Sequence, residues 1–228
     1  MRRAGYGRPA FGPVPPESPL ARPHTRSVDR HLADSLLDAA GWVRATTGGP
    51  RARVAANKSR PLSFELLTVG SSDNAIEQLI QSDLAAVGIR MEIRQLEGGA
   101  FLARAREHTK TFDAIITGVP GDIALSFLPA MFDSAQAGGA LDYAAYHTAA
   151  LDRLFATARA ASTDASRRDA WGAIQDSLAS FLPVSWIYHS RGVQGVSARL
   201  GNVRMDLRGE LATLQQWSVL GPPGTKRR

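Results

Sequence analysis

The sequence contains no cysteine among its 228 residues. This absence excludes disulfide bonds, thiolate metal sites and a cysteine nucleophile, but it does not fix the compartment in which the protein works. No stretch approaches the ~20 consecutive apolar residues of a membrane-spanning helix. Prolines also interrupt every candidate for the apolar part of a secretory signal in the first thirty residues. We therefore expect no export signal in the chain as written.

Motifs that carry known chemistry are missing as well. There is no Walker loop, no HExxH and no GxSxG, and the five histidines have no metal-ligand spacing. GYGRPA (5–10) matches a dinucleotide fingerprint in form, but no strand precedes it and Pro9 stands where a helix should begin. The sequence therefore predicts no enzyme, no metal site and no cofactor.

The net positive charge of the chain comes from its two ends. Residues 1–60 carry 11 basic and 4 acidic side chains, and residues 61–225 carry 13 basic and 17 acidic ones. The last three residues are all basic. A nucleic-acid-binding protein would concentrate its charge on an ordered face, so we expect no nucleic-acid partner.

Hydrophobic periodicity then predicts regular structure. Residues 1–26 are expected to form an extended crossing segment. A helix is expected over 28–40, with Ser27 as N-cap and Gly41 after its end, followed by a loop over 43–60.

Residues 62–119 follow a strand–helix–strand–helix–strand pattern. The expected strands are 62–69, 90–96 and 112–119; the expected helices are one after Ser71–Asp73 that Gly88 ends, and one over 99–108. Such a βαβαβ unit has right-handed crossovers and an at least partly parallel sheet. Two further helices (149–161 and 166–181) and strands over 183–190 and 203–207 complete an α/β chain.

Several stretches resemble one protein family in the same order along the chain. They are FGPVPPESP (11–19), DSLLDAAGW (34–42), PLSFELLT (61–68), LAAVGIRMEIRQLE (84–97), FDAIITG (112–118), LDYAAYHTAALDRLFATARA (141–160) and LPVSWIY (182–188). Together they resemble the bacterial extracellular solute-binding proteins of family 5, the peptide-, dipeptide- and nickel-binding components of ABC importers.

The resemblance implies a periplasmic-binding-protein type II-like lobe with a βαβαβ core, plus incomplete elements of a second lobe. We expect residues 1–60 to belong to the first lobe or hinge and 61–182 to form the second lobe. Residues 183–220 are expected to return to the first lobe, and 221–228 to be a disordered tail. In the family the proline-rich crossing lies deep inside a longer chain, so this sequence resembles a C-terminal part, and a truncated reading frame is the simplest explanation.

If the first lobe is missing, some apolar side chains should lack a cover. Those at stake are Phe11, Val14, Val203, Met205, Leu207, Leu211, Leu214 and Trp217. We expect the isolated chain to self-associate through them, because large exposed apolar patches invite association.

The function implied is transport without chemistry. A substrate-binding component binds an oligopeptide or similar small solute in a cleft between two lobes that close by a hinge. The partners would be this solute and ABC permease subunits. The location would be periplasmic or at the cell surface, or cytoplasmic if the chain has no export signal.

The segment TGVPGDIALSFL (117–128) resembles the family's ligand loop, in which an aspartate meets the α-amino group of a peptide. Asp122 occupies that position, and Val119, Pro120 and Gly121 are ligand-binding candidates beside it. Val119 stands where the family commonly has tryptophan. Asp122 could instead cap a helix beginning near Ile123, and the sequence leaves both roles open.

Two further interpretations concern other residues. Tyr143 and Tyr146 match a tyrosine pair of the family, and packing is the favoured role for both.

The rival function is a small α/β enzyme or a nucleotide- or anion-binding domain that uses GSSDN (70–74) after the first strand, although this loop lacks the repeated glycines of a phosphate cradle. A third possibility is an interaction module that uses the exposed ends.

Overall fold

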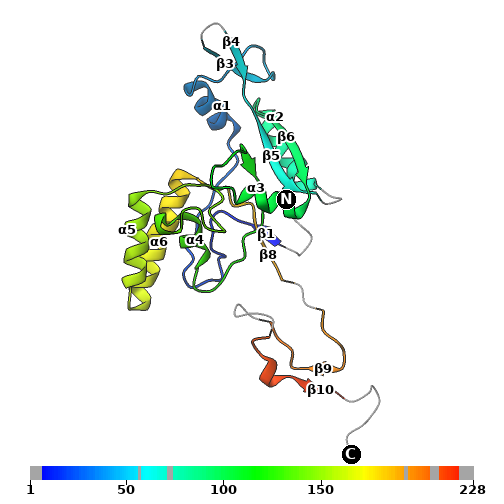
Figure 1. Cartoon of the computed structure of the whole chain (residues 1–228), viewed down its shortest axis with the longest axis vertical. Coiled ribbons are helices and arrows are strands. Elements are labelled where there is room, and N and C mark those ends of the chain that lie inside the picture. Colours follow the sequence, from blue (N-terminus) through cyan, green and yellow to red (C-terminus); the bar gives the residue numbers. More distant parts are fainter. Residues whose placement is uncertain (1–6, 56–57, 71–73, 193–194, 206–210, 221–228) are drawn as a thin grey trace, which may run out of the picture. The chain divides into compact units, whose positions relative to one another are not determined.

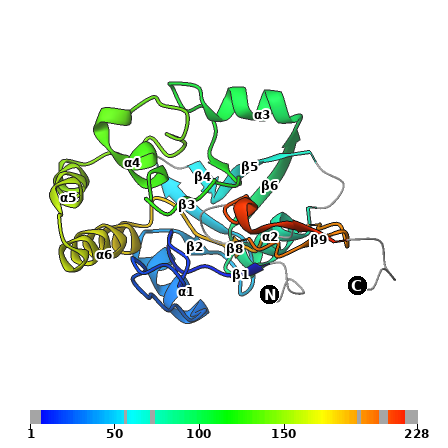
Figure 2. The same ribbon diagram turned by 90° about the horizontal axis from the view of Figure 1, so that it is seen from below.

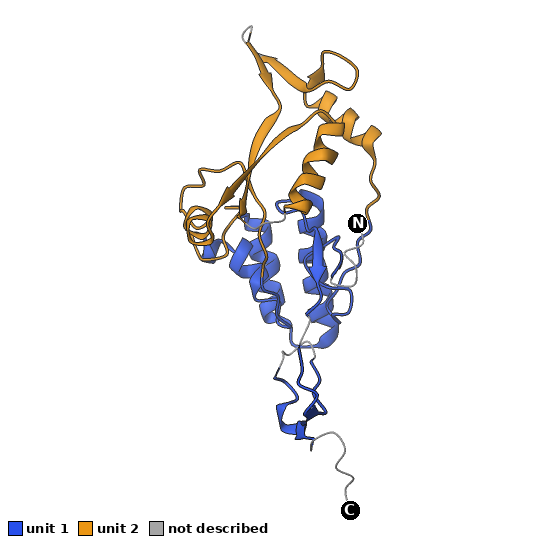
Figure 3. Cartoon of the chain, turned by 90° about the vertical axis from the view of Figure 1, so that its right-hand side faces the viewer, with its two compact units in different colours: residues 1–25, 120–137, 146–228 blue, residues 26–119, 138–145 orange. Residues whose placement is uncertain are grey.

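The computed structural model describes residues 7–55, 58–70, 74–192, 195–205 and 211–220. The chain divides into two compact units (Figure 3). Unit 1 comprises residues 1–25, 120–137 and 146–228, and unit 2 comprises residues 26–119 and 138–145. The domain boundaries expected after residues 60, 182 and 220 stay a prediction, and the expected tail lies outside the described residues.

A parallel sheet forms the centre of unit 2. Its middle strand β5 (Ser63–Val69) pairs in parallel with β6 (Arg90–Leu96) on one side and with β7 (Ala114–Ile115) on the other. Helices α2 (Ala75–Ala86) and α3 (Gly98–Ala105) make the crossovers (Figure 1). The predicted βαβαβ unit is therefore confirmed, although β7 is much shorter than the strand expected over 112–119.

One cluster of apolar side chains fixes α3 and the following segment to this sheet. Leu67, Phe101, Ala105 and Tyr143 are buried together, and Leu96, Phe112, Ile115 and Leu141 pack against them. Leu66 points to the opposite face and is also buried. The packing role expected for Tyr143 is thus confirmed.

A second, antiparallel sheet occupies residues 43–61, where we had predicted a loop. It contains β2 (Val43–Arg44), β3 (Arg51–Ala55) and β4 (Lys58–Pro61) in that order. The prediction was wrong because arginine and lysine occupy the positions where apolar residues would normally alternate with polar ones.

A buried arginine of this second sheet links it to helix α1 (Arg30–Ala39). Arg51 is only 1% exposed and donates hydrogen bonds to the Asp34 and Asp38 carboxylates and to the carbonyls of Trp42 and Val87. The N-cap of α1 is Asp29, which accepts from the Leu32 amide at 2.8 Å, and not Ser27 as predicted.

Unit 1 contains a pair of long helices. α5 (Ala149–Ala160) and α6 (Asp164–Phe181) lie side by side (Figures 1 and 2), and the rings of Phe155 and Trp171 meet edge to face, 6.5 Å apart. Phe181 is exposed, because α6 ends there with Leu182 in the left-handed conformation. No helix of the described residues is both long and apolar enough to cross a membrane.

The remaining elements of unit 1 are short. They are α4 (Phe127–Phe132), η1 (Ser134–Gln136), the antiparallel pairs β1 (Gly7–Pro9) with β8 (Tyr188–Ser190) and β9 (Leu200–Gly201) with β10 (Ser218–Val219), and η2 (Leu214–Gln216). The strand predicted over 183–190 is therefore limited to its last three residues. The one predicted over 203–207 is wrong for residues 203–205, and its remainder lies outside the described residues.

Candidate ligand-binding loop

The predicted ligand loop begins shortly after β7. Val119, half-buried, is the last residue of this stretch of unit 2, and Pro120, Gly121 and Asp122 open a segment of unit 1. All three are exposed. A side chain at Gly121 would meet no atom within 4 Å, so the backbone is open to solvent at this point.

Asp122 is held by one neighbour four residues ahead. One carboxylate oxygen accepts from the Ser126 amide at 3.1 Å, and the other accepts from the Ser126 hydroxyl at 2.5 Å. Partial burial disfavours the charged form, but the hydrogen bonds from Ser126, together with those from the Ala124 and Leu125 amides, outweigh it and hold the pKa of Asp122 below its ordinary value. The side chain is therefore a carboxylate at neutral pH.

These contacts bear on the two roles considered for Asp122. No helix begins near Ile123, where we had predicted one; residues 123–124 form a turn and α4 starts at Phe127. The carboxylate thus stabilises the turn before α4. The amides of Ala124 and Leu125 add further hydrogen bonds to the carboxylate. The side chain is nevertheless exposed, so an ammonium group can reach it.

Two residues of the loop were not singled out from the sequence. Leu125 is buried and has φ 57°, a left-handed conformation that is unfavourable for a branched side chain. Its amide donates to the Asp122 carbonyl at 3.3 Å, which closes the turn. Ser126 donates hydrogen bonds to the Asp122 carboxylate from its amide and from its hydroxyl. The sequence could have indicated this role, because a serine stands four residues after Asp122.

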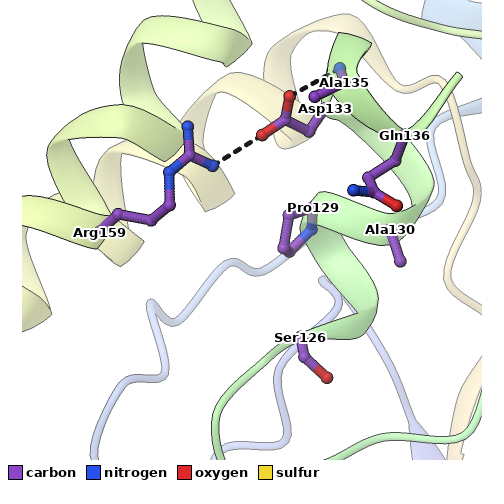
Figure 4. A pocket seen from close by; sticks show the side chains of 7 residues that line it. All are labelled: Ser126, Pro129, Ala130, Asp133, Ala135, Gln136 and Arg159. Carbon is purple, nitrogen blue, oxygen red and sulfur yellow. Dashed lines mark hydrogen bonds and ion pairs between the residues drawn. The ribbon is translucent and has the colours of Figure 1, made fainter.

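A shallow hollow of about 400 Å³ lies along α4, also within unit 1 (Figure 4). Its lining consists of Ser126, Pro129, Ala130, Asp133, Ala135, Gln136 and Arg159. Buried Asp133 accepts from the Arg159 guanidinium at 2.7 Å and from the Ala135 amide at 3.0 Å. Ser126 therefore belongs both to the Asp122 loop and to this hollow.

The loop at 70–74, which the rival function requires, offers little to an anion. Residues 71–73 lie outside the described residues. Asn74 precedes α2 but makes no capping hydrogen bond with its side chain, and Glu77 places a negative charge in the first turn. That charge opposes an anion at a helix N-terminus. Among the described residues, no group of three or more His, Asp or Glu side chains is placed to hold a metal ion.

Comparison with known proteins agrees with this architecture. The sequence profile of the bacterial extracellular solute-binding proteins, family 5, middle part, matches residues 2–140. Protein XP55 of Streptomyces lividans is 26% identical over 226 residues, which is 98% of this chain and 40% of that protein. The oligopeptide-binding protein AppA of Bacillus subtilis is 22% identical over 216 residues, covering 89% of this chain and 38% of AppA.

Solved structures show the same fold. The AppA structure with a bound nonapeptide superimposes with a TM-score of 0.72 at 20% identity, covering 95% of this chain and 43% of AppA. A dipeptide-binding protein of Pseudoalteromonas in complex with Met-Leu gives a TM-score of 0.70 at 23% identity, over 90% of this chain and 39% of that one. The fold is therefore that of the type II periplasmic binding proteins.

The chain belongs to the bacterial extracellular solute-binding proteins, family 5. The resemblance drawn from the sequence motifs is thus confirmed. The chain spans about 40% of the length of the curated relatives that it matches over most of its own length.

Proposed function

We propose that this chain contributes part of the solute-binding site of an ABC importer, and that Asp122 pairs with the α-amino group of a bound peptide. The observation that carries the proposal is the exposed, deprotonated carboxylate of Asp122 shortly after the carboxyl end of β7. Ligands of open α/β sheets bind at that end of the strands. A carboxylate and an ammonium group make a strong, charge-assisted hydrogen bond.

The relatives support a peptide as the solute. AppA was solved with a nonapeptide and the Pseudoalteromonas protein with Met-Leu. A probable di/tripeptide-binding protein of Pseudomonas aeruginosa is 37% identical over 94 residues, which is 40% of this chain and 17% of that protein. Val119, Pro120 and Gly121 would line the ligand's path beside Asp122.

The wider assignment follows from the family. The binding step would be coupled to hinge closure between two lobes, and the partners would be ABC permease subunits at the outer side of a membrane. No bond is made or broken in such a role, so we propose a binding protein and not an enzyme. The described residues supply only part of a two-lobed site, so we expect millimolar rather than micromolar affinity for this chain alone.

An NMR titration of the whole chain with a free tripeptide and its N-acetylated form tests this proposal. The free peptide should shift the amide signals of Gly121–Ser126. In Asp122→Asn the amide oxygen can still accept one hydrogen bond from Ser126, but the charge is gone. We expect about tenfold weaker binding of the free peptide, the effect of ~1.4 kcal/mol, and no change for the acetylated one. Asp169→Asn, an exposed change on α6, should leave both unchanged.

Two results would contradict the proposal. If no signal of the loop moves at millimolar peptide, Asp122 does not contribute a binding site. If the Asp122 variant weakens both peptides equally, the carboxylate acts only through the turn that it stabilises.

A further inference from the structure

One face of the antiparallel sheet in unit 2 is built almost entirely from basic side chains. Directly paired residues of an antiparallel sheet point to the same face. Arg44 pairs with Arg51, and Arg53 pairs with Arg60. Because side chains alternate along a strand, Lys58 lies on this face with Arg60. The face, which we call the basic face, therefore carries Arg44, Arg51, Arg53, Lys58 and Arg60.

Only part of this charge is neutralised within the protein. Arg44 and Arg51 are paired with Asp34 and Asp38 of α1. Arg53 donates to the Ala40 carbonyl at 2.8 Å and lies over the Trp42 ring at 5.7 Å, but neither partner is charged. Among the described residues, Arg53, Lys58 and Arg60 have no ion pair.

Helix α1 contacts the basic face through two aspartates, which both stay partly exposed. Asp34 and Asp38 are one turn apart and contact Arg51. Leu32 and Leu36 are also one turn apart, on a side of the helix roughly 160° away from the two aspartates. They are accordingly 55% and 61% exposed. An amphipathic helix normally buries its apolar side; the buried arginine reverses this arrangement.

The exposed leucines and the unpaired cations consequently share one side of unit 2. The leucines lie on the side of α1 opposite the aspartates that contact Arg51, and Lys58 and Arg60 are exposed on the basic face. Val28, just before α1, is 90% exposed and extends the apolar stripe. Arg30 lies one turn before Asp34, on the acidic side of the helix, with a loose ion pair to Asp83 at 3.6 Å.

We propose that this surface, made of Val28, Leu32, Leu36, Arg53, Lys58 and Arg60, attaches the protein peripherally to an anionic phospholipid membrane. Apolar side chains of an interfacial helix enter the boundary between headgroups and acyl chains, while neighbouring basic side chains meet the lipid phosphates. Half-buried Trp42, next to Arg53, suits the same interfacial region. A nucleic acid would satisfy the cations but would leave the leucine stripe uncovered, which favours the membrane.

Vesicle sedimentation with the full chain tests the proposal. The probes are vesicles of phosphatidylcholine alone, and vesicles with phosphatidylcholine and phosphatidylglycerol in a two-to-one ratio. Binding should require the anionic lipid and should weaken as salt is raised. Lys58→Gln with Arg60→Gln should lower the partition coefficient about 25-fold, since each basic side chain near the surface contributes about fivefold. Leu32→Ser with Leu36→Ser should lower it at least about tenfold at unchanged charge.

A matched control separates this surface from the overall charge. Arg167→Gln with Arg168→Gln removes the same two charges from exposed positions of α6 in unit 1, and it should change the partition less than about twofold. The leucine and the lysine–arginine variants alter different elements, so a folding defect in one, seen by circular dichroism, leaves the other as a test.

Three outcomes would overturn the proposal. In the first, the full chain does not bind the anionic vesicles. In the second, the Lys58/Arg60 pair affects binding no more than the Arg167/Arg168 pair, so that binding comes from charge elsewhere. In the third, the surface variants abolish binding to a DNA duplex but not to vesicles, which would identify a nucleic-acid surface instead. None of these measurements involves a peptide, so the proposal stands or falls separately from the role of Asp122.

Discussion

At the scale of single residues, the sequence could identify groups that a motif marks but not groups that the fold assembles. Asp122 was found because its loop resembles a family pattern. Leu125 was not, because a buried leucine with positive φ has no signature in sequence. Arg51 was missed for a related reason: it gains its partners from α1 and from the end of α2, which only the folded chain brings together.

Arg51 gives the residue-scale prediction. Arg51→Met removes the donors to the Trp42 and Val87 carbonyls and should lower the free energy of unfolding by about 2–4 kcal/mol. Arg90→Met, on an exposed strand position with a surface pair to Glu92, should change it by less than about 0.5 kcal/mol. Urea unfolding of both variants provides the comparison. Equal effects would mean that the cluster around Arg51 does not anchor α1.

The same variant should change the response to acid. Hydrogen bonds from Arg51 and then Arg44 lower the pKa of Asp34 in the folded chain. A carboxyl group whose pKa is lower in the folded chain stabilises the folded state at pH values above its unfolded-state pKa, which is near 3.8. This stabilisation is lost as the pH falls through the folded-state pKa. Without Arg51, the loss of stability on acidification below about pH 4 should be shallower than in the parent chain.

At the scale of elements, periodicity predicted those that bury an apolar side. The strand–helix alternation over 62–119 and the two helices of unit 1 follow from apolar spacing and from glycines such as Gly41 and Gly88, both with positive φ. The sheet of β2, β3 and β4 did not follow, because its residues are basic and its stability depends on α1 lying over it. Tertiary contacts, not local preference, make those strands.

The proline-rich crossing segment provides the element-scale prediction. Buried Gln175 of α6 accepts from the Arg22 amide and donates to the Leu20 carbonyl, both at 2.9 Å. Gln175→Ala removes this tether, so the exchange of the Arg22 amide hydrogen should accelerate about fivefold, for a net hydrogen bond of ~1 kcal/mol. Exchange of the Ala33 amide in α1 should stay unchanged. An unaltered rate at Arg22 would show that other contacts hold the segment.

At the scale of the whole molecule, the sequence predicted the family and most of the uncovered apolar side chains, although Val203 and Trp217 are half-buried. Phe11 is 44% exposed as expected, but Val14 is buried within the described residues. Val14 lies in the crossing segment that Gln175 secures to α6, so its cover comes from this chain. Leu207 lies outside the described residues. The exposed side chains that remain are concentrated near the C-terminal end of the chain.

These C-terminal side chains lead to the prediction for the whole chain. Leu211, Leu214 and Val219 are all more than half exposed, and each large apolar side chain left in water forgoes about 1.5–3 kcal/mol of burial. The chain alone should therefore self-associate with rising concentration in sedimentation-velocity experiments. Leu211→Ser with Leu214→Ser should shift it toward the monomer, because the contact surface loses its apolar area. Leu79→Ser with Leu102→Ser changes two exposed leucines of α2 and α3 and serves as the control. A chain that stays monomeric at every concentration, or one that both variants affect equally, would show that the C-terminal side chains do not form an interface.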